Sequence, residues 1–145
     1  MTTQPPPMIV IHDADGARAA LAAARALGRR VTLLSPPATS AALGPGVFAE
    51  SVAAGAEDAA PVEALYDCAD QAGLAMAALR RGGLDVVVDL PAETAAKIAE
   101  LARARGRRAY APGDLDGRAV LDLDAEFASG RAEARVTRFL EDHPQ

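Results

Sequence analysis

The sequence is poor in the residues that build aromatic cores, disulfide frameworks and strongly basic surfaces. Aromatic residues make up 3% of the 145 residues, tryptophan is absent, and Cys68 is the single cysteine. One cysteine excludes an internal disulfide, which fits the reducing cytoplasm where we expect the protein to be located. The net charge of −5 at pH 7 gives no electrostatic support to a nucleic-acid partner.

Long apolar runs are also missing, although half of the residues are hydrophobic. No stretch approaches the roughly 18 uncharged apolar residues of a membrane helix, so we expect no membrane partner. Residues 1–7 lack the basic and apolar parts of a secretory signal and are expected to form a disordered tail. Arginine far outnumbers lysine and asparagine is absent, a bias that indicates a bacterial source with a GC-rich genome.

Short apolar runs alternate along the chain with alanine-rich segments of helical periodicity. Ala17, Leu21 and Ala24 recur at steps of three or four residues, and Gly28 follows where a left-handed helix terminator belongs. Residues 119–123 are a further strand or an extended arm, and residues 131–142 a last helix. The pattern predicts strands over 8–11, 31–34, 62–66, 84–88 and 107–111, and helices over 16–27, 47–54, 70–80 and 91–105.

This alternation predicts an α/β domain over residues 8–123. We expect a three-layer structure, flavodoxin-like or Rossmann-like, in which helices cover both faces of a mainly parallel five-stranded sheet. The expected strand order is 2-1-3-4-5 or 3-2-1-4-5. The competing architecture is a fragment of a βα barrel, whose open edges would pair with another chain.

The end of the chain, residues 124–145, is expected to form a helical extension. Phe139 and Leu140 have no obvious place in a five-stranded domain, and alanine-rich helices permit close approach. We therefore expect a homo-oligomer. The alternative is that both side chains cover an open face of their own subunit.

Polar residues collect where the predicted strands end. Ligands of open α/β sheets bind beyond the carboxyl ends of the strands, whereas the opposite strand ends here carry mostly glycine and arginine. We therefore predict a small-ligand-binding or regulatory module. The alternative is that these polar residues only end strands and cap helices. The predicted ligand-binding residues are His12, Asp13, Ser35, Asp67, Cys68 and Asp89.

The run His12-Asp13-Ala14-Asp15-Gly16 resembles two motifs of metal-dependent phosphatases. It is similar to the first motif of the DHH phosphoesterases, and its two acids resemble the Asp-x-Asp pair of the haloacid dehalogenases. The resemblance implies phosphoester hydrolysis at these residues. The chain departs from the DHH pattern by lacking a residue between His12 and Asp13 and any Asp-His-His sequence. It departs from the dehalogenases because they have an insertion before their first helix, whereas here the first predicted helix begins at once. A metal-dependent phosphoesterase is therefore the second alternative function.

The acids after the first and third predicted strands resemble the phosphoacceptor site of response-regulator receivers. These acids are Asp13 and Asp15 after the first strand and Asp67 after the third. The departures are that Lys97, the single lysine, lies within a predicted helix, and that Asp89 stands where receivers have a hydroxyl residue. The resemblance therefore implies a degenerate receiver-like module that binds a protein and does not transfer phosphate.

A nucleophilic role for Cys68 is not favoured, because Asp67 and Asp70 flank it and raise the pKa of a thiol. No complete set of nucleophile, base and orienting group is present, and no glycine-rich phosphate loop. We therefore do not expect an enzyme or a cofactor. Cys68, His12 and His143 form no ligand pairs at zinc spacing, so we also expect no structural metal.

Three segments make the chain similar to a family of small bacterial α/β proteins without an established activity. The similarity spans about residues 8–123. It implies the fold and a soluble bacterial protein. The segments are Ile11-His12, Val31-Thr-Leu-Leu-Ser-Pro36 and Asp67-Cys-Ala-Asp-Gln-Ala-Gly-Leu-Ala75.

Overall fold

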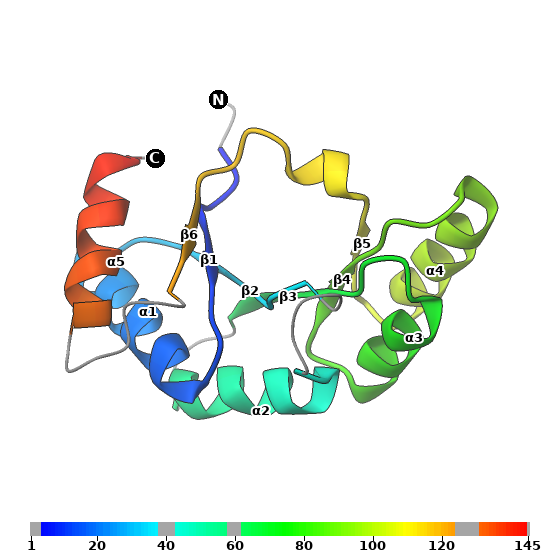
Figure 1. Cartoon of the computed structure of the whole chain (residues 1–145), viewed down its shortest axis with the longest axis horizontal. Helices are drawn as coiled ribbons and strands as arrows, with labels where there is room; N and C mark the ends of the chain where they lie inside the picture. The colour runs from blue at the N-terminus through cyan, green and yellow to red at the C-terminus, as the bar shows by residue number, and fades with distance from the viewer. Residues whose placement is uncertain (1–3, 38–42, 58–61, 124–130, 145) are drawn as a thin grey trace.

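The computed structural model of the chain describes residues 4–37, 43–57, 62–123 and 131–144. Figure 1 shows a curved sheet with α-helices around its outer side. The strands are β1 (Met8–Val10), β2 (Thr32–Leu34), β3 (Glu63–Asp67), β4 (Asp85–Val87), β5 (Ala109–Tyr110) and β6 (Val120–Asp122). The helices are α1 (Ala14–Leu27), α2 (Pro45–Ala56), α3 (Ala72–Arg81), α4 (Ala92–Ala104), α5 (Arg131–Asp142) and the short 3-10 helix η1 (Pro112–Leu115).

The α/β class with a parallel sheet is confirmed, with six strands where five were expected. All neighbouring strands are parallel, and their order is β5-β4-β3-β2-β1-β6. Both predicted strand orders are therefore wrong. Each of β2 to β5 pairs with the strand that precedes it in the chain, and residues 119–123 supply β6, which returns to pair with β1. Hydrophobic pattern locates a strand but does not say which neighbour it pairs with.

The strand order explains where the helices lie. Four successive crossovers in one direction, each right-handed, place α1 to α4 on the same side of the sheet. Figure 1 shows α5, α1, α2, α3 and α4 following one another around that side. The connection from β5 to β6 reverses direction and crosses the other side, where η1 lies. Helical elements thus lie on both sides, although the α-helices of the described residues share one of them.

Alternate strand residues face two separate apolar clusters. Ile9 and Leu33 belong to the main core beneath the α-helices. Met8, Leu65 and Val87 form a smaller cluster on the opposite side, against which Leu34, Tyr110 and Leu115 pack. Because side chains alternate along a strand, the polar residues that continue the Met8 and Val87 series lie on the side opposite the α-helices.

The alanine-rich composition shows its effect where α1 and α2 meet. Gly55 is buried against α1, and a Cβ atom at this position would lie 2.5 Å from the Cβ of Ala17 and 2.7 Å from the amide nitrogen of Arg18. Only glycine fits this approach without displacing a helix. Small residues therefore let the helices pack closely although the core has few aromatic rings.

The predicted disordered tail is wrong for Pro6 and Pro7, which are buried. The Pro7 carbonyl accepts a hydrogen bond from the Thr32 amide at 3.0 Å, and the Pro6 carbonyl accepts one from Arg118 Nε at 3.0 Å. Residues 1–3 lie outside the described residues. Pro6 and Pro7 are ordered because the residues just before β1 are hydrogen-bonded to the neighbouring strand β2 and to the segment before β6.

The predicted C-terminal helix is present over the expected residues 131–142, and it packs against α1 as part of the main core. Residues 124–130 and 145 of the expected extension lie outside the described residues. Leu140 is fully buried and Phe139 is 6% exposed. Both side chains therefore cover their own subunit, and the homo-oligomer stays a prediction without the support they were expected to give.

Candidate functional site

The parallel sheet gathers the predicted site residues at one edge, formed by the carboxyl ends of the strands and called here the carboxyl edge. His12 and Asp13 follow β1, Ser35 follows β2, Asp67 ends β3, and Asp89 lies two residues beyond β4. The sequence segments directly beyond the described strand ends contain no lysine or arginine. The carboxyl edge is consequently acidic.

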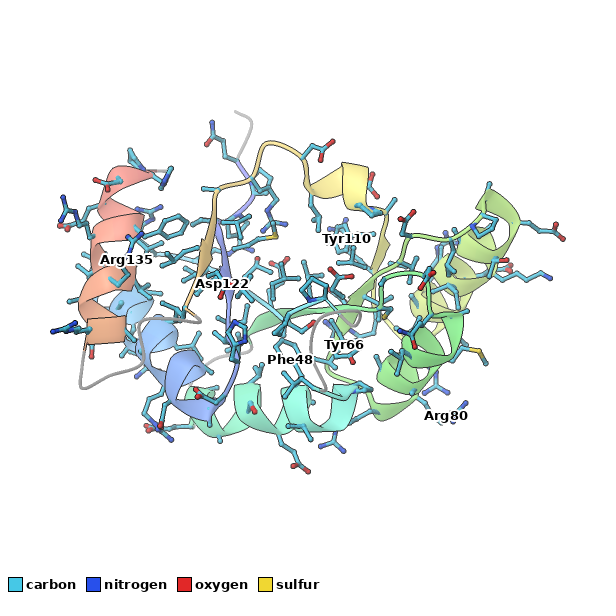
Figure 2. The ribbon with its side chains drawn as sticks, in the orientation of Figure 1. Phe48, Tyr66, Arg80, Tyr110, Asp122 and Arg135 are labelled. Atoms are coloured by element: carbon cyan, nitrogen blue, oxygen red, sulfur yellow. The ribbon has the colours of Figure 1, made fainter. Side chains whose placement is uncertain are left out.

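A side-chain contact at this edge joins His12 to Asp122. His12 Nε2 lies 2.8 Å from Asp122 Oδ1, and the two residues are 110 positions apart in the chain. Their side chains are 26% and 56% exposed. The contact follows from the return of β6 to β1, in which Asp122 pairs with Val10. Figure 2 labels Asp122 on β6, beside β1.

Sequence reasoning missed Asp122. The residue was visible as an acid near the end of a possible strand over 119–123, the same position relative to its strand as the other site residues. What the pattern could not show was the neighbour of that strand, because the strand order expected from the sequence did not pair it with β1.

Ser35, Asp67 and Asp89 are linked through one turn. Ser35 Oγ accepts a hydrogen bond from the Asp67 amide at 2.8 Å, and Asp67 Oδ1 accepts one from the Ala69 amide at 3.0 Å. The Asp89 amide in turn donates to the Ala69 carbonyl at 2.9 Å. Ala69 has φ of +52°, a conformation that non-glycine residues rarely adopt. Ser35 is buried and positions the turn, whereas Asp89 is exposed at the edge.

Asp13 caps α1 and does not join this group. Its Oδ1 accepts a hydrogen bond from the Gly16 amide at 2.8 Å, as expected for an N-cap residue. Asp15 pairs with Arg18 at 2.9 Å on the surface. Among the described residues no group of three histidine, cysteine or acidic side chains is placed to hold a metal ion. The geometry therefore gives no support to the metal-dependent phosphoesterase.

Cys68 is fully buried on the α-helix side of the sheet. Its thiol donates a weak hydrogen bond to the Tyr66 carbonyl, with 3.6 Å between sulfur and oxygen. Burial, with a smaller contribution from the charge of Asp67, raises the pKa of the thiol to about 12. Cys68 is thus protonated at neutral pH and belongs to the core. Side chains alternate between the two sides of the sheet along a strand. Tyr66 and Cys68 therefore face the α-helices, whereas Leu65 and Asp67 face the opposite side. This alternation explains why Cys68, although it lies at a strand end, does not reach the surface.

The strand order also bears on the receiver-like alternative. In the flavodoxin-like order 2-1-3-4-5 the first and third strands are neighbours. Here β2 lies between β1 and β3, so Asp13 and Asp67 follow strands that are not adjacent. The arrangement of acids that suggested a phosphoacceptor site is absent from the described residues.

A scan against protein-family models finds no match, and a search of curated proteins finds none either. Within the ranges that the structure describes, no helix has both the length and the apolar character needed to cross a membrane.

Proposed function

We propose that the protein binds a small polar ligand at the carboxyl edge, as a ligand-binding or regulatory module of the bacterial cytoplasm. The observation that carries the proposal is the His12–Asp122 pair. It joins two adjacent parallel strands at the edge where ligands of open α/β sheets bind, and both side chains are partly exposed.

The chemistry of this edge favours a neutral or cationic ligand that carries hydroxyl or amino groups. Asp122 orients the imidazole of His12, and the ring nitrogens donate or accept a hydrogen bond according to the tautomer. Asp67 and Asp89 supply further carboxylate acceptors along the same edge. A phosphate group would be repelled by the like charge of these carboxylates.

The proposal is of binding and not of catalysis. Cys68 is buried and protonated, and Ser35 is buried with its hydroxyl engaged by Asp67. Neither residue offers an accessible nucleophile beside His12. We also propose, on the composition of the sequence, that the protein is a homo-oligomer.

A thermal-shift screen of polyols, amino sugars, amino acids and polyamines tests the proposal, with sugar phosphates as the disfavoured class. A ligand at one hundred times its dissociation constant stabilises the fold by about 2.7 kcal/mol, which raises Tm by roughly 8 °C for a chain of this size. The shift should be lost in His12→Ala and in Asp122→Asn.

Glu100→Gln is the matched control, because it removes the same charge from an exposed position on α4. It should leave the ligand-induced shift unchanged. A compound whose shift survives both edge substitutions would contradict the proposal. So would a protein partner that still binds the His12→Ala, Asp122→Asn double variant.

A further inference from the structure

A hollow of about 570 Å³ lies at the other end of the sheet, along the open side of β5. Three strands separate β5 from β1, so this hollow is distinct from the His12–Asp122 pair. The hollow is lined by three arginines, together with Tyr110 and Asp114. Arg103 lies at the end of α4, and Arg107 and Arg108 lie directly before β5. We call it the arginine pocket.

The fold fixes the backbone that carries these arginines. Asp85, whose side chain is 8% exposed, accepts from Arg107 Nε at 2.9 Å and from the Arg108 amide at 3.0 Å. Gly106 ends α4 with φ of +69°, and its amide donates to the Arg103 carbonyl at 3.0 Å. The turn from α4 to β5 therefore holds all three positions, and the bond to Asp85 holds the Arg107 side chain.

The arginine pocket carries slightly more positive than negative charge, although the whole chain carries −5. Three guanidinium groups meet two carboxylates. Asp114 lies in the lining and accepts a hydrogen bond from the Ala111 amide at 2.8 Å, and Asp85 pairs with Arg107. The end of α4 adds roughly half a negative charge from its dipole, so a small positive excess remains. Arg108 Nη1 also lies 3.4 Å from the Tyr110 hydroxyl, so one donor of the pocket is positioned by a neighbour.

Protection of a sheet edge is the simplest other role for these arginines. The chain, however, already covers much of this edge. The Arg107 amide donates to the Ala102 carbonyl at 2.8 Å, and the Ala111 amide donates to Asp114. These are the amides on either side of the short strand β5.

We propose that the arginine pocket binds a small oxyanion through Arg103, Arg107 and Arg108. A planar guanidinium offers paired donors that match the oxygens of a phosphate or a carboxylate, and these charge-assisted bonds are the strong ones. The volume lies within the range of small-molecule sites, about 300–1,000 Å³. Phosphate esters and polycarboxylates share this chemistry.

Amide chemical shifts measured by NMR during titration with pyrophosphate, and separately with citrate, test the proposal at constant ionic strength. Saturable shifts are expected at Gly106, Arg108 and Ala109. Saturation with pyrophosphate alone indicates a phosphate ester, saturation with citrate alone a polycarboxylate, and either result supports the pocket. Absence of saturation with both anions overturns the proposal.

Arg103→Gln, Arg108→Gln should weaken binding about tenfold. Both side chains are exposed and the double variant keeps the Arg107–Asp85 bond, so the fold should persist. The single variant Arg103→Gln, expected to weaken binding about threefold, serves if the double variant does not fold.

Arg80→Gln, Arg135→Gln is the matched control. It removes the same charge from exposed positions on α3 and α5, which Figure 2 labels, and should change the affinity by less than about twofold. Equal weakening in the two double variants would show general attraction to a charged surface and would overturn the proposed site.

Discussion

Substitution of Gly55 by alanine probes the tightest contact in the fold, where α2 meets α1. The new Cβ would lie 2.5 Å from the Cβ of Ala17, whereas carbon atoms pack best at about 3.5–4.0 Å. It would also lie 2.7 Å from the Arg18 nitrogen and 2.9 Å from the Ala17 carbonyl carbon. These last two are backbone atoms, so no change of rotamer relieves the contact and the helices must separate.

The balance of two effects gives the expected magnitude. Overpacking of a core costs about 1–3 kcal/mol. Alanine in place of glycine inside a helix contributes about 1 kcal/mol in the opposite direction. Because the clash involves backbone, we expect the upper part of the range and a net loss of about 1–2 kcal/mol. Urea unfolding followed by far-UV circular dichroism measures this difference in the free energy of unfolding.

Gly73→Ala is the matched control, since Gly73 is also helical and a Cβ there would meet nothing within 4 Å. It should leave stability unchanged or raise it by up to about 1 kcal/mol. The double variant Ala17→Gly, Gly55→Ala removes the 2.5 Å contact but keeps the two backbone contacts, so it should recover only part of the clash energy. A Gly55→Ala protein as stable as the unmodified chain would show that α1 and α2 can separate at this contact without cost.

Three other predictions concern stability and assembly. Asp85→Ala should lower the free energy of unfolding in urea by about 2–3 kcal/mol, because the Arg107 side chain and the Arg108 amide lose a nearly buried carboxylate. The control Asp15→Ala, at an exposed position, should have little effect, and equal losses in the two variants would contradict this prediction. The thiol of Cys68 has a pKa of about 12 in the folded protein and about 8.5 in the unfolded chain. Its contribution to the free energy of unfolding is therefore complete below about pH 8.5 and is lost as the pH rises toward 12. Between pH 9 and 10 the unmodified chain should therefore lose about 1 kcal/mol more stability than Cys68→Ala, and parallel curves would count against a buried thiol. Sedimentation should detect a homo-oligomer, and one 14.9 kDa species at all micromolar concentrations would reject that expectation.

Local structure was largely predictable from the sequence because its signals are local. The predicted helix over 131–142 has the observed bounds, and Gly28 ends α1 in the left-handed conformation with φ of +63°. Most other helices and strands begin and end within a few residues of the predicted positions. Capping residues, apolar periodicity and glycine geometry act within one or two turns of chain, so a single sequence contains them.

Pairing and side-chain facing were not predictable in the same way. The contact between His12 and Asp122 depends on which edge of the sheet β6 joins, a choice made by packing over the whole domain. The clustering of acids at the carboxyl edge was predicted, since it requires only that the strands be parallel. Cys68 shared that strand-end position but faces the helices, which the alternation of side chains in β3 decides.

A double-mutant cycle at His12 and Asp122 tests whether these two side chains bind the ligand together. The compound with the largest thermal shift is titrated calorimetrically into the unmodified protein, His12→Ala, Asp122→Asn and the double variant. If the two side chains form one binding unit, the double variant should bind no more weakly than the worse single variant. Additive losses, or affinities that none of the substitutions changes, would contradict a ligand site organised by this pair.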